Sequence, residues 1–155
     1  MEKKFLTFLE IARALNRHDI VPILYGSLGL YRIIGELSEV NDIDIVVPEI
    51  YLKEKFSELA GIMTEIRYKQ DSMYPHEFTG RDHQIGFESK EEIEAYEGVN
   101  FSDFKITKID DAEFKELSAE DYLVVYKKNL KFREEKIKDM KPKIKALEEF
   151  LRNKQ

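Results

Sequence analysis

The fold is decided by the stretch Leu24-Tyr25-Gly26-Ser27, which is followed, after fourteen further residues, by Asp42-Ile43-Asp44-Ile45. A β-prone apolar run over residues 20–25 ends at the Gly-Ser pair. Apolar residues at helical spacing predict a helix over 28–37, and alternating aspartate and isoleucine predict a second strand over 42–47. We therefore expect strand, turn, helix and strand in succession, with the turn and the aspartates at one edge of a sheet.

Asp42 and Asp44 are expected to share one face of the second strand, because side chains two residues apart on a strand point to the same side. Ile43, Ile45 and Val47 alternate with them and are expected to face the core. Two carboxylates held this close repel each other unless positive charge lies between them. Mg²⁺ binds oxygen ligands and typically combines one or two carboxylates with substrate phosphates. The pair is therefore a candidate metal site.

Gly26 and Ser27 form a candidate phosphate site. Glycine at a strand-to-helix turn lets the backbone approach a ligand closely and adopt dihedral angles that other residues avoid. Ser27 stands where a helix N-cap is expected, in front of backbone N–H groups that have no partner within the helix. Such a helix N-terminus binds anions, and phosphate above all.

This arrangement resembles the nucleotidyltransferase superfamily, whose polymerase-β-like core carries a Gly-Gly or Gly-Ser turn and then Asp-x-Asp on the next strand. The matching residues are Gly26, Ser27, Asp42 and Asp44. The resemblance covers about residues 20–90, and the small size is similar to minimal, antibiotic-modifying and toxin-type members. It implies transfer of a nucleoside monophosphate from an NTP to an acceptor hydroxyl or phosphate, with two Mg²⁺ (or Mn²⁺) ions as cofactors. The acceptor is not identified by the sequence.

The superfamily pattern also asks for a third carboxylate on a later strand. Alternation along the strand expected over 83–88 leaves Gln84 and Glu88 on the side of the aspartates, and Gln84 cannot carry the charge. Glu77, on the strand before it, is the catalytic candidate, and Glu88 is the alternative. His76 and His83 flank this hairpin and are candidates for positioning a substrate, although a lone histidine on a strand more often packs or faces solvent.

The C-terminal helices carry basic residues that a polyphosphate could attract. Several nucleotidyltransferases look similar here and use a late Lys-Asp pair to contact the triphosphate, which implies a nucleotide-binding role for Arg133 and Lys138. Asp139, Lys136 and Lys143 lie in the same segment, and a solvated helix face is the alternative for all of these residues. Tyr122 and Tyr126, four residues apart, are expected to pack against the core.

The remaining elements complete an α+β pattern in which helices flank a small mixed sheet. A single nucleotidyltransferase-like domain is expected over 1–155, with its core at about 20–90 and a helical segment at about 118–155. Ser118, three residues before Asp121, resembles a capping box, and Pro142 is expected to kink or split the last helix. The other expectations are helices over 2–17 and 49–62, strands over 63–69 and 74–79, and an acidic, irregular stretch over 89–117 with a possible strand at 104–109.

Composition limits the functional classes. The chain has 155 residues and no cysteine, which excludes disulfides, thiolate metal sites and cysteine nucleophiles. No apolar run is long enough for a membrane span and the first residues lack a signal-peptide core, so we expect a cytoplasmic protein. The net charge of −6 hides an uneven distribution: residues 88–121 carry 4 basic and 12 acidic side chains, whereas residues 127–155 carry 11 and 5.

Three other interpretations of the sequence stay open. The Asp-x-Asp and Gly-Ser pairs could be solvated strand and turn residues of no special role. The fold could persist as a catalytically silent nucleotide-binding or protein-interaction module of antitoxin-like type. The basic C-terminal helices could contact RNA, although the overall negative charge does not favour nucleic acid as a partner.

Overall fold

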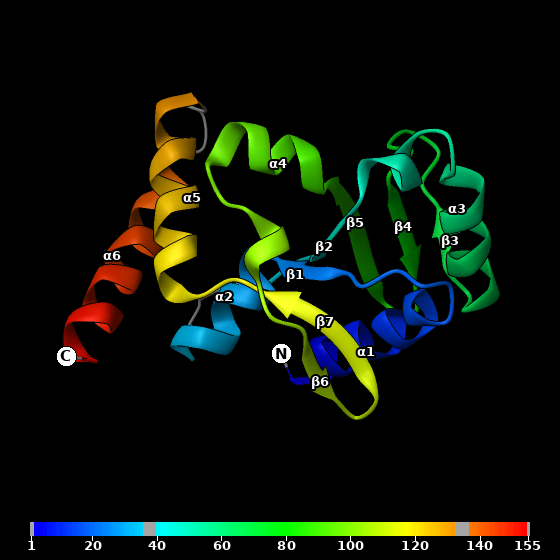
Figure 1. Ribbon diagram of the computed structural model, residues 1–155, viewed down its shortest axis with the longest axis horizontal. Coiled ribbons are helices and arrows are strands. Elements are labelled where there is room, and N and C mark those ends of the chain that lie inside the picture. Colours follow the sequence, from blue (N-terminus) through cyan, green and yellow to red (C-terminus); the bar gives the residue numbers. More distant parts are fainter. Residues whose placement is uncertain (1, 36–39, 133–136, 155) are drawn as a thin grey trace.

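The computed structural model describes residues 2–35, 40–132 and 137–154. Within these ranges the chain forms six α-helices, two short 3₁₀ helices and seven strands (Figure 1). The elements follow in the order α1 (Glu2–Asn16), β1 (Ile23–Tyr25), α2 (Gly26–Ile34), β2 (Ile43–Val47), η1 (Glu49–Leu52), α3 (Phe56–Glu65), β3 (Lys69–Gln70), β4 (Glu77–Gly80), β5 (His83–Ser89), α4 (Lys90–Glu97), η2 (Phe101–Asp103), β6 (Thr107–Ile109), β7 (Ala112–Glu116), α5 (Ala119–Phe132) and α6 (Ile137–Asn153).

The strands form one mixed sheet in the order β3-β4-β5-β2-β1-β7-β6. Strand β2 lies near the centre, where it pairs antiparallel with β1 and parallel with β5. Strand β1 also pairs parallel with β7 on its other side. Seven mixed strands with flanking helices confirm the expected α+β class with a mixed sheet.

Each face of the sheet is covered by a different set of helices. Ile43, Ile45 and Val47 of β2 belong to a buried cluster that includes side chains of α1 and α3. Val46 belongs to a second cluster, formed with side chains of α2, α4, α5 and α6. Asp44 shares the face of Val46, because side chains alternate along a strand. The isoleucines therefore face the core as expected, and Asp44 lies on the side of the C-terminal helices.

The C-terminal helices pack directly against α2. Figure 1 shows α5 and α6 (yellow to red) lying together beside α2 at one end of the molecule. A Cβ atom at Gly29 of α2 would lie 2.0 Å from the Tyr122 hydroxyl oxygen of α5, so the glycine makes room for this contact. Tyr122 and Tyr126 are both buried, which confirms the expectation that they pack in the core.

Several expected element boundaries are wrong. The helix expected over 49–62 is the 3₁₀ helix η1 followed by α3, and most of the strand expected over 63–69 is the end of α3 and the residues after it. The stretch 89–117 is not irregular, since it contains α4, η2, β6 and β7. Pro142 does not split α6, which runs through it from Ile137 to Asn153.

The expected cap at Ser118 is confirmed. Its hydroxyl oxygen accepts a hydrogen bond from the Asp121 backbone N–H at 3.1 Å, and an Asp121 carboxylate oxygen accepts one from the Ser118 backbone N–H at 3.1 Å. This reciprocal pair satisfies N–H groups at the start of α5. No described helix is both long and apolar enough to cross a membrane.

Candidate functional site

The Gly-Ser turn joins β1 directly to α2. Gly26 is the first residue of α2 and has a φ angle of +66°, which side-chain-bearing residues rarely adopt. A Cβ atom built on Gly26 would lie 2.3 Å from Oδ2 of Asp44, which is far inside van der Waals contact. Glycine is therefore required at this position twice, once for the backbone angle and once for the close approach of the carboxylate.

Asp44 lies between two glycines. Its backbone pairs with Tyr25 of β1 on one side and with Gly86 of β5 on the other. A Cβ atom at Gly86 would lie 3.3 Å from Oδ1 of Asp44, so this glycine also keeps space beside the carboxylate. The sheet register thus brings Asp44 against the Gly-Ser turn. Asp42 immediately precedes β2 and is partly exposed.

Ser27 is not the N-cap of α2. That position belongs to Tyr25, whose backbone is extended and whose side chain makes no hydrogen bond to the first turn of the helix. The helix begins earlier than the expected position because Gly26 itself adopts a conformation that allows the sharp change of direction. The first-turn amides of α2 therefore have no side-chain cap from Tyr25, as an anion site requires.

Lys143 of α6 reaches the Gly-Ser turn. Its ammonium group donates a hydrogen bond to the Ser27 hydroxyl at 3.2 Å and lies 5.8 Å from the centre of the Tyr126 ring. A cation from the basic C-terminal segment is thus held at the start of α2, 116 residues away along the chain. Lys138 and Asp139 belong to α6, although their side chains fall outside the described part, and Arg133 and Lys136 lie outside the described residues altogether.

The candidates for the third carboxylate occupy different places on the sheet. Glu77 of β4 pairs with Gly86, so a whole strand separates it from Asp44, and its carboxylate accepts a hydrogen bond from the Gln84 amide at 3.0 Å. Glu88 lies two residues beyond Gly86 and faces the same side as Asp44. Among the described residues no group of three or more aspartate, glutamate or histidine side chains is arranged to hold a metal ion.

Three buried tyrosines belong to the cluster on the same face of the sheet as Asp44. Burial raises the pKa of Tyr25, Tyr122 and Tyr126, and nearby carboxylates raise it further: Glu97 for Tyr25 and Asp44 for Tyr126. All three hydroxyls therefore remain protonated donors. Tyr25 donates to the carboxylate of Glu97, whereas the hydroxyls of Tyr122 and Tyr126 have no hydrogen-bond partner among the described residues.

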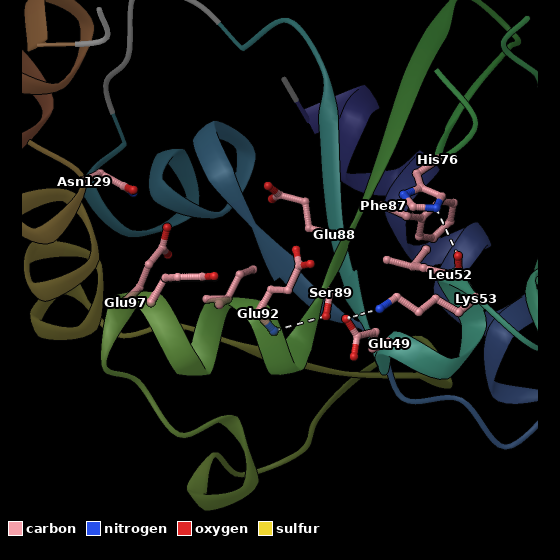
Figure 2. A pocket seen from close by; sticks show the side chains of 12 residues that line it. Glu49, Leu52, Lys53, His76, Phe87, Glu88, Ser89, Glu92, Glu97 and Asn129 are labelled. Carbon is pink, nitrogen blue, oxygen red and sulfur yellow. Dashed lines mark hydrogen bonds and ion pairs between the residues drawn. The ribbon is translucent and has the colours of Figure 1, made fainter. Parts of the chain in front are cut away.

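A cavity of about 490 Å³ opens beside this site, between η1, β5, α4 and α5 (Figure 2). Its polar lining includes the carboxylates of Glu49, Glu88, Glu92 and Glu97 and the amide of Asn129. Sequence reasoning had named only Glu88 of these, and it missed the other four because they come together only when η1, α4 and α5 pack around the sheet. The one available signal was the excess of acidic residues over 88–121.

The two hairpin histidines lie in different environments. His76 lines the cavity, and its Nε2 atom lies 3.1 Å from the carbonyl oxygen of Leu52. His83 is buried on the other face of β5, since it lies two residues before Ile85 and shares that residue's face, whereas Gly86 and Glu88 face the side of Asp44. Only His76 is therefore near a place where a substrate could bind.

Comparisons with known proteins agree with the fold. No protein-family model matches the chain. Over 97% of its length the chain is 34% identical to the "Uncharacterized protein YnaI" of Bacillus subtilis (strain 168), and the match covers 99% of that protein. Its structure is similar to the solution structure of the antibiotic-resistance factor ANT(2'')-Ia, with a TM-score of 0.57, 15% identity and coverage of 100% of this chain and 86% of the other.

A crystal structure of ANT(2'')-Ia in complex with adenylyl-2''-tobramycin gives a TM-score of 0.55 at 13% identity, covering 94% of this chain and 87% of that one. Both solved structures are of an aminoglycoside nucleotidyltransferase, so the chain has a nucleotidyltransferase-like fold. Sequence identities of 15% and 13% support a common fold and nothing beyond it.

Proposed function

The chain belongs to the family of the Bacillus subtilis protein YnaI, and we propose that it is a metal-dependent nucleotidyltransferase that transfers a nucleoside monophosphate from an NTP to an acceptor. The observation that carries this proposal is the contact between Gly26 and Asp44. It places a carboxylate directly beside the uncapped N-terminus of α2, so that backbone N–H groups that can bind phosphate and a possible metal ligand share one small site.

The groups at the Gly-Ser turn and the C-terminal basic residues bind the NTP in this proposal. The backbone amides at Gly26 and Ser27 bind the phosphates of the NTP. Lys143, which touches Ser27, supplies a positive charge for the phosphate oxygens. Arg133 and Lys138 remain predicted triphosphate contacts.

The donor set fits one divalent ion better than two. Asp42 and Asp44 would hold Mg²⁺ or Mn²⁺ together with oxygens of the NTP, and the ion when bound supplies neutralisation of charge on the phosphates. A second ion would need a further carboxylate, but Gln84 stands on the relevant face of β5 and binds Glu77 instead. The proposal therefore rests on a single metal site at Asp42 and Asp44.

The reaction is an in-line displacement at the α-phosphorus of the NTP. The acceptor oxygen forms a bond to this phosphorus while the bond from phosphorus to the α–β bridging oxygen breaks, and pyrophosphate leaves. The proton of the acceptor hydroxyl passes to a carboxylate on the same face as Asp44. Glu88 is our candidate for this base because it lies on that face and also lines the cavity. Glu77, one strand further out, is the alternative.

Labelled NTPs test the proposed reaction directly. The purified chain is incubated with Mg²⁺, an extract of small molecules and ATP or GTP labelled at either the α- or the γ-phosphate. We expect label from the α-position, and not from the γ-position, to enter a new product, and we expect the Asp44→Asn variant to transfer none. Transfer of the γ-label, or equal transfer by the Asp44→Asn variant, would contradict the proposal.

A catalytically silent nucleotide-binding module is the second candidate. The pairing of Gln84 with Glu77 favours it, because this pair occupies the face on which the third carboxylate is expected. Such a module would bind NTP and Mg²⁺ at the Gly-Ser turn without moving the α-label. Nucleotide binding in the absence of any α-label transfer would therefore select this candidate over the enzyme.

A further inference from the structure

We propose that the cavity beside the turn is the acceptor site and that it takes an acceptor carrying positively charged amine groups. This inference rests on the proposed function, because an acceptor is needed only if a nucleoside monophosphate is transferred. It is carried by the position of the cavity, the charge of its wall and the polar and apolar groups that line it.

The cavity adjoins the proposed reaction centre. Glu88 lines the cavity and lies two residues from Gly86, which packs beside the Asp44 carboxylate. Two residues on a strand span about 6.6 Å, which is a distance that a small acceptor can bridge. Tyr126, whose hydroxyl has no hydrogen-bond partner among the described residues, lies on α5, the helix that also lines the cavity through Asn129.

The wall of the cavity is strongly acidic. Four glutamates line it against a single lysine, Lys53, which already pairs with Glu49 at 3.2 Å. Glu97 is only 9% exposed and accepts the hydrogen bond of Tyr25. Figure 2 shows the carboxylates of Glu88 and Glu92 directed into the open space above α4. An anionic acceptor would meet repulsion here, whereas an ammonium group would be attracted.

Asn129 adds a neutral polar group to the acidic wall. Asn129 is only 9% exposed and lines the cavity from α5. A bound acceptor would find both kinds of partner in this amide, because its oxygen can accept from an ammonium group and its nitrogen can donate to a hydroxyl.

The size and the apolar part of the lining fit a small organic cation. About 490 Å³ falls in the range of ordinary small-molecule sites. Leu52, Phe87 and Ile93 provide apolar contacts for a carbon chain. Tyr96 lines the cavity and is 72% exposed, and an aromatic ring can attract a cation to its face.

Two probes of equal length test the preference for charge. Calorimetric titration of the whole chain compares 1,8-diaminooctane, which carries two ammonium groups, with 1,8-octanediol, which carries none. We expect the diamine to bind at least about tenfold more tightly, a difference of about 1.4 kcal/mol. Equal affinity for the two probes, or no binding of the diamine, would overturn the inference.

Matched variants locate the binding. Glu92→Gln removes an exposed carboxylate of the cavity, and Glu58→Gln removes an exposed carboxylate in the first turn of α3, which does not line it. We expect the first variant to weaken diamine binding several-fold and the second to leave it unchanged. Asn129→Leu should also weaken binding. Equal effects of the two glutamate variants, or displacement of the diamine by Mg²⁺ alone, would overturn the inference.

The same samples separate this inference from the function on which it rests. ATP with Mg²⁺ is titrated into each variant. If ATP binds but the diamine does not, the inference fails and the proposed function stands. If the diamine binds but ATP does not, the proposed function fails and the acceptor role with it.

Discussion

At the scale of single residues, the site depends on the contact between Gly26 and Asp44. Gly26→Ala would add a Cβ atom 2.3 Å from Oδ2 of Asp44 and would also strain a residue with φ of +66°. We expect this variant to lose most of its affinity for NTP with Mg²⁺, because the carboxylate has to move. The measurement is a calorimetric titration of ATP into the wild type and the variant.

Gly35→Ala is the matched control for this prediction. Gly35 also has a positive φ angle, of 78°, but within the described part of the chain no atom lies within 4 Å of a Cβ built there. Both variants should lose roughly 1–2 kcal/mol of stability through backbone strain, and only Gly26→Ala should lose nucleotide binding. Similar nucleotide affinities in the two variants would show that the close approach to Asp44 has no role in binding.

The sequence could predict the position of a site residue only where the order of the surrounding helices and strands determines that position. Gly26 and Asp44 could be assigned to one site because the order strand, turn, helix, strand brings them together. The role of Ser27 as N-cap could not be predicted correctly, since the cap depends on the backbone angle of Gly26. Glu97 and Asn129 could not be predicted as cavity residues, because α4 and α5, which carry them, lie far from the Gly-Ser turn in sequence and reach the cavity only through helix packing.

At the scale of elements, the start of α5 depends on the reciprocal bonds between Ser118 and Asp121. Ser118→Ala removes the side-chain acceptor for the Asp121 backbone N–H and should lower the free energy of unfolding by about 1 kcal/mol. Chemical denaturation measures this loss. Ser72→Ala, at an exposed loop position, should change the stability by much less. Equal stabilities of the two variants would contradict the capping role.

Helix α6 contributes a cation to the Gly-Ser turn through Lys143. Lys143→Gln should weaken NTP binding several-fold and should reduce the dependence of the affinity on salt, because one screened charge interaction is lost. Lys145→Gln removes an exposed lysine of the same helix and is expected to leave both quantities unchanged. Nucleotide titrations at two salt concentrations give both results. Identical behaviour of the two variants would remove α6 from the nucleotide site.

Elements with clear periodicity or end signals could be predicted, and the others could not. The alternation of Asp42 to Val47 and the cap at Ser118 gave correct predictions. Helix α4 was missed because its sequence, Lys90–Glu97, is dominated by charged residues with few apolar ones to show a periodicity. Strand β7 is short, and its buried residues become recognisable only through its parallel pairing with β1.

At the scale of the whole molecule, His83 makes stability depend on pH. Burial lowers its pKa below the ordinary value, and Lys4 and Lys3 lower it further. The unfolded chain therefore binds the proton more readily, so the contribution of neutral His83 is complete above about pH 6.5 and is lost as the pH falls below this value. We expect a lower free energy of unfolding at about pH 5.5 than at about pH 7.5.

Substitution of the histidines checks the source of this pH dependence. His83→Gln should reduce the difference in unfolding free energy between the two pH values, as measured by urea denaturation. His18→Gln, which replaces an exposed histidine, should leave the difference as it is in the wild type. An unchanged difference in the His83→Gln variant would contradict the assignment.

The fold separates the acidic and the basic stretches of the chain and places them at different parts of the proposed site. The acidic stretch over 88–121 contains α4, whose glutamates form a wall of the cavity. The basic segment after residue 126 contains α6, which brings Lys143 to the Gly-Ser turn. The fold therefore places a cation where we propose that phosphate binds and anions where we propose that a cationic acceptor binds.

The most direct test of the central claim is a calorimetric titration of ATP in the presence and absence of Mg²⁺. It compares the wild type with Asp44→Asn and with Asp19→Asn, an exposed control at which asparagine also suits the positive φ angle. We predict Mg²⁺-dependent binding to the wild type and to Asp19→Asn, and none to Asp44→Asn, with all three proteins folded by circular dichroism. Absence of binding to the wild type with either Mg²⁺ or Mn²⁺, or equal binding to Asp44→Asn, would contradict the account.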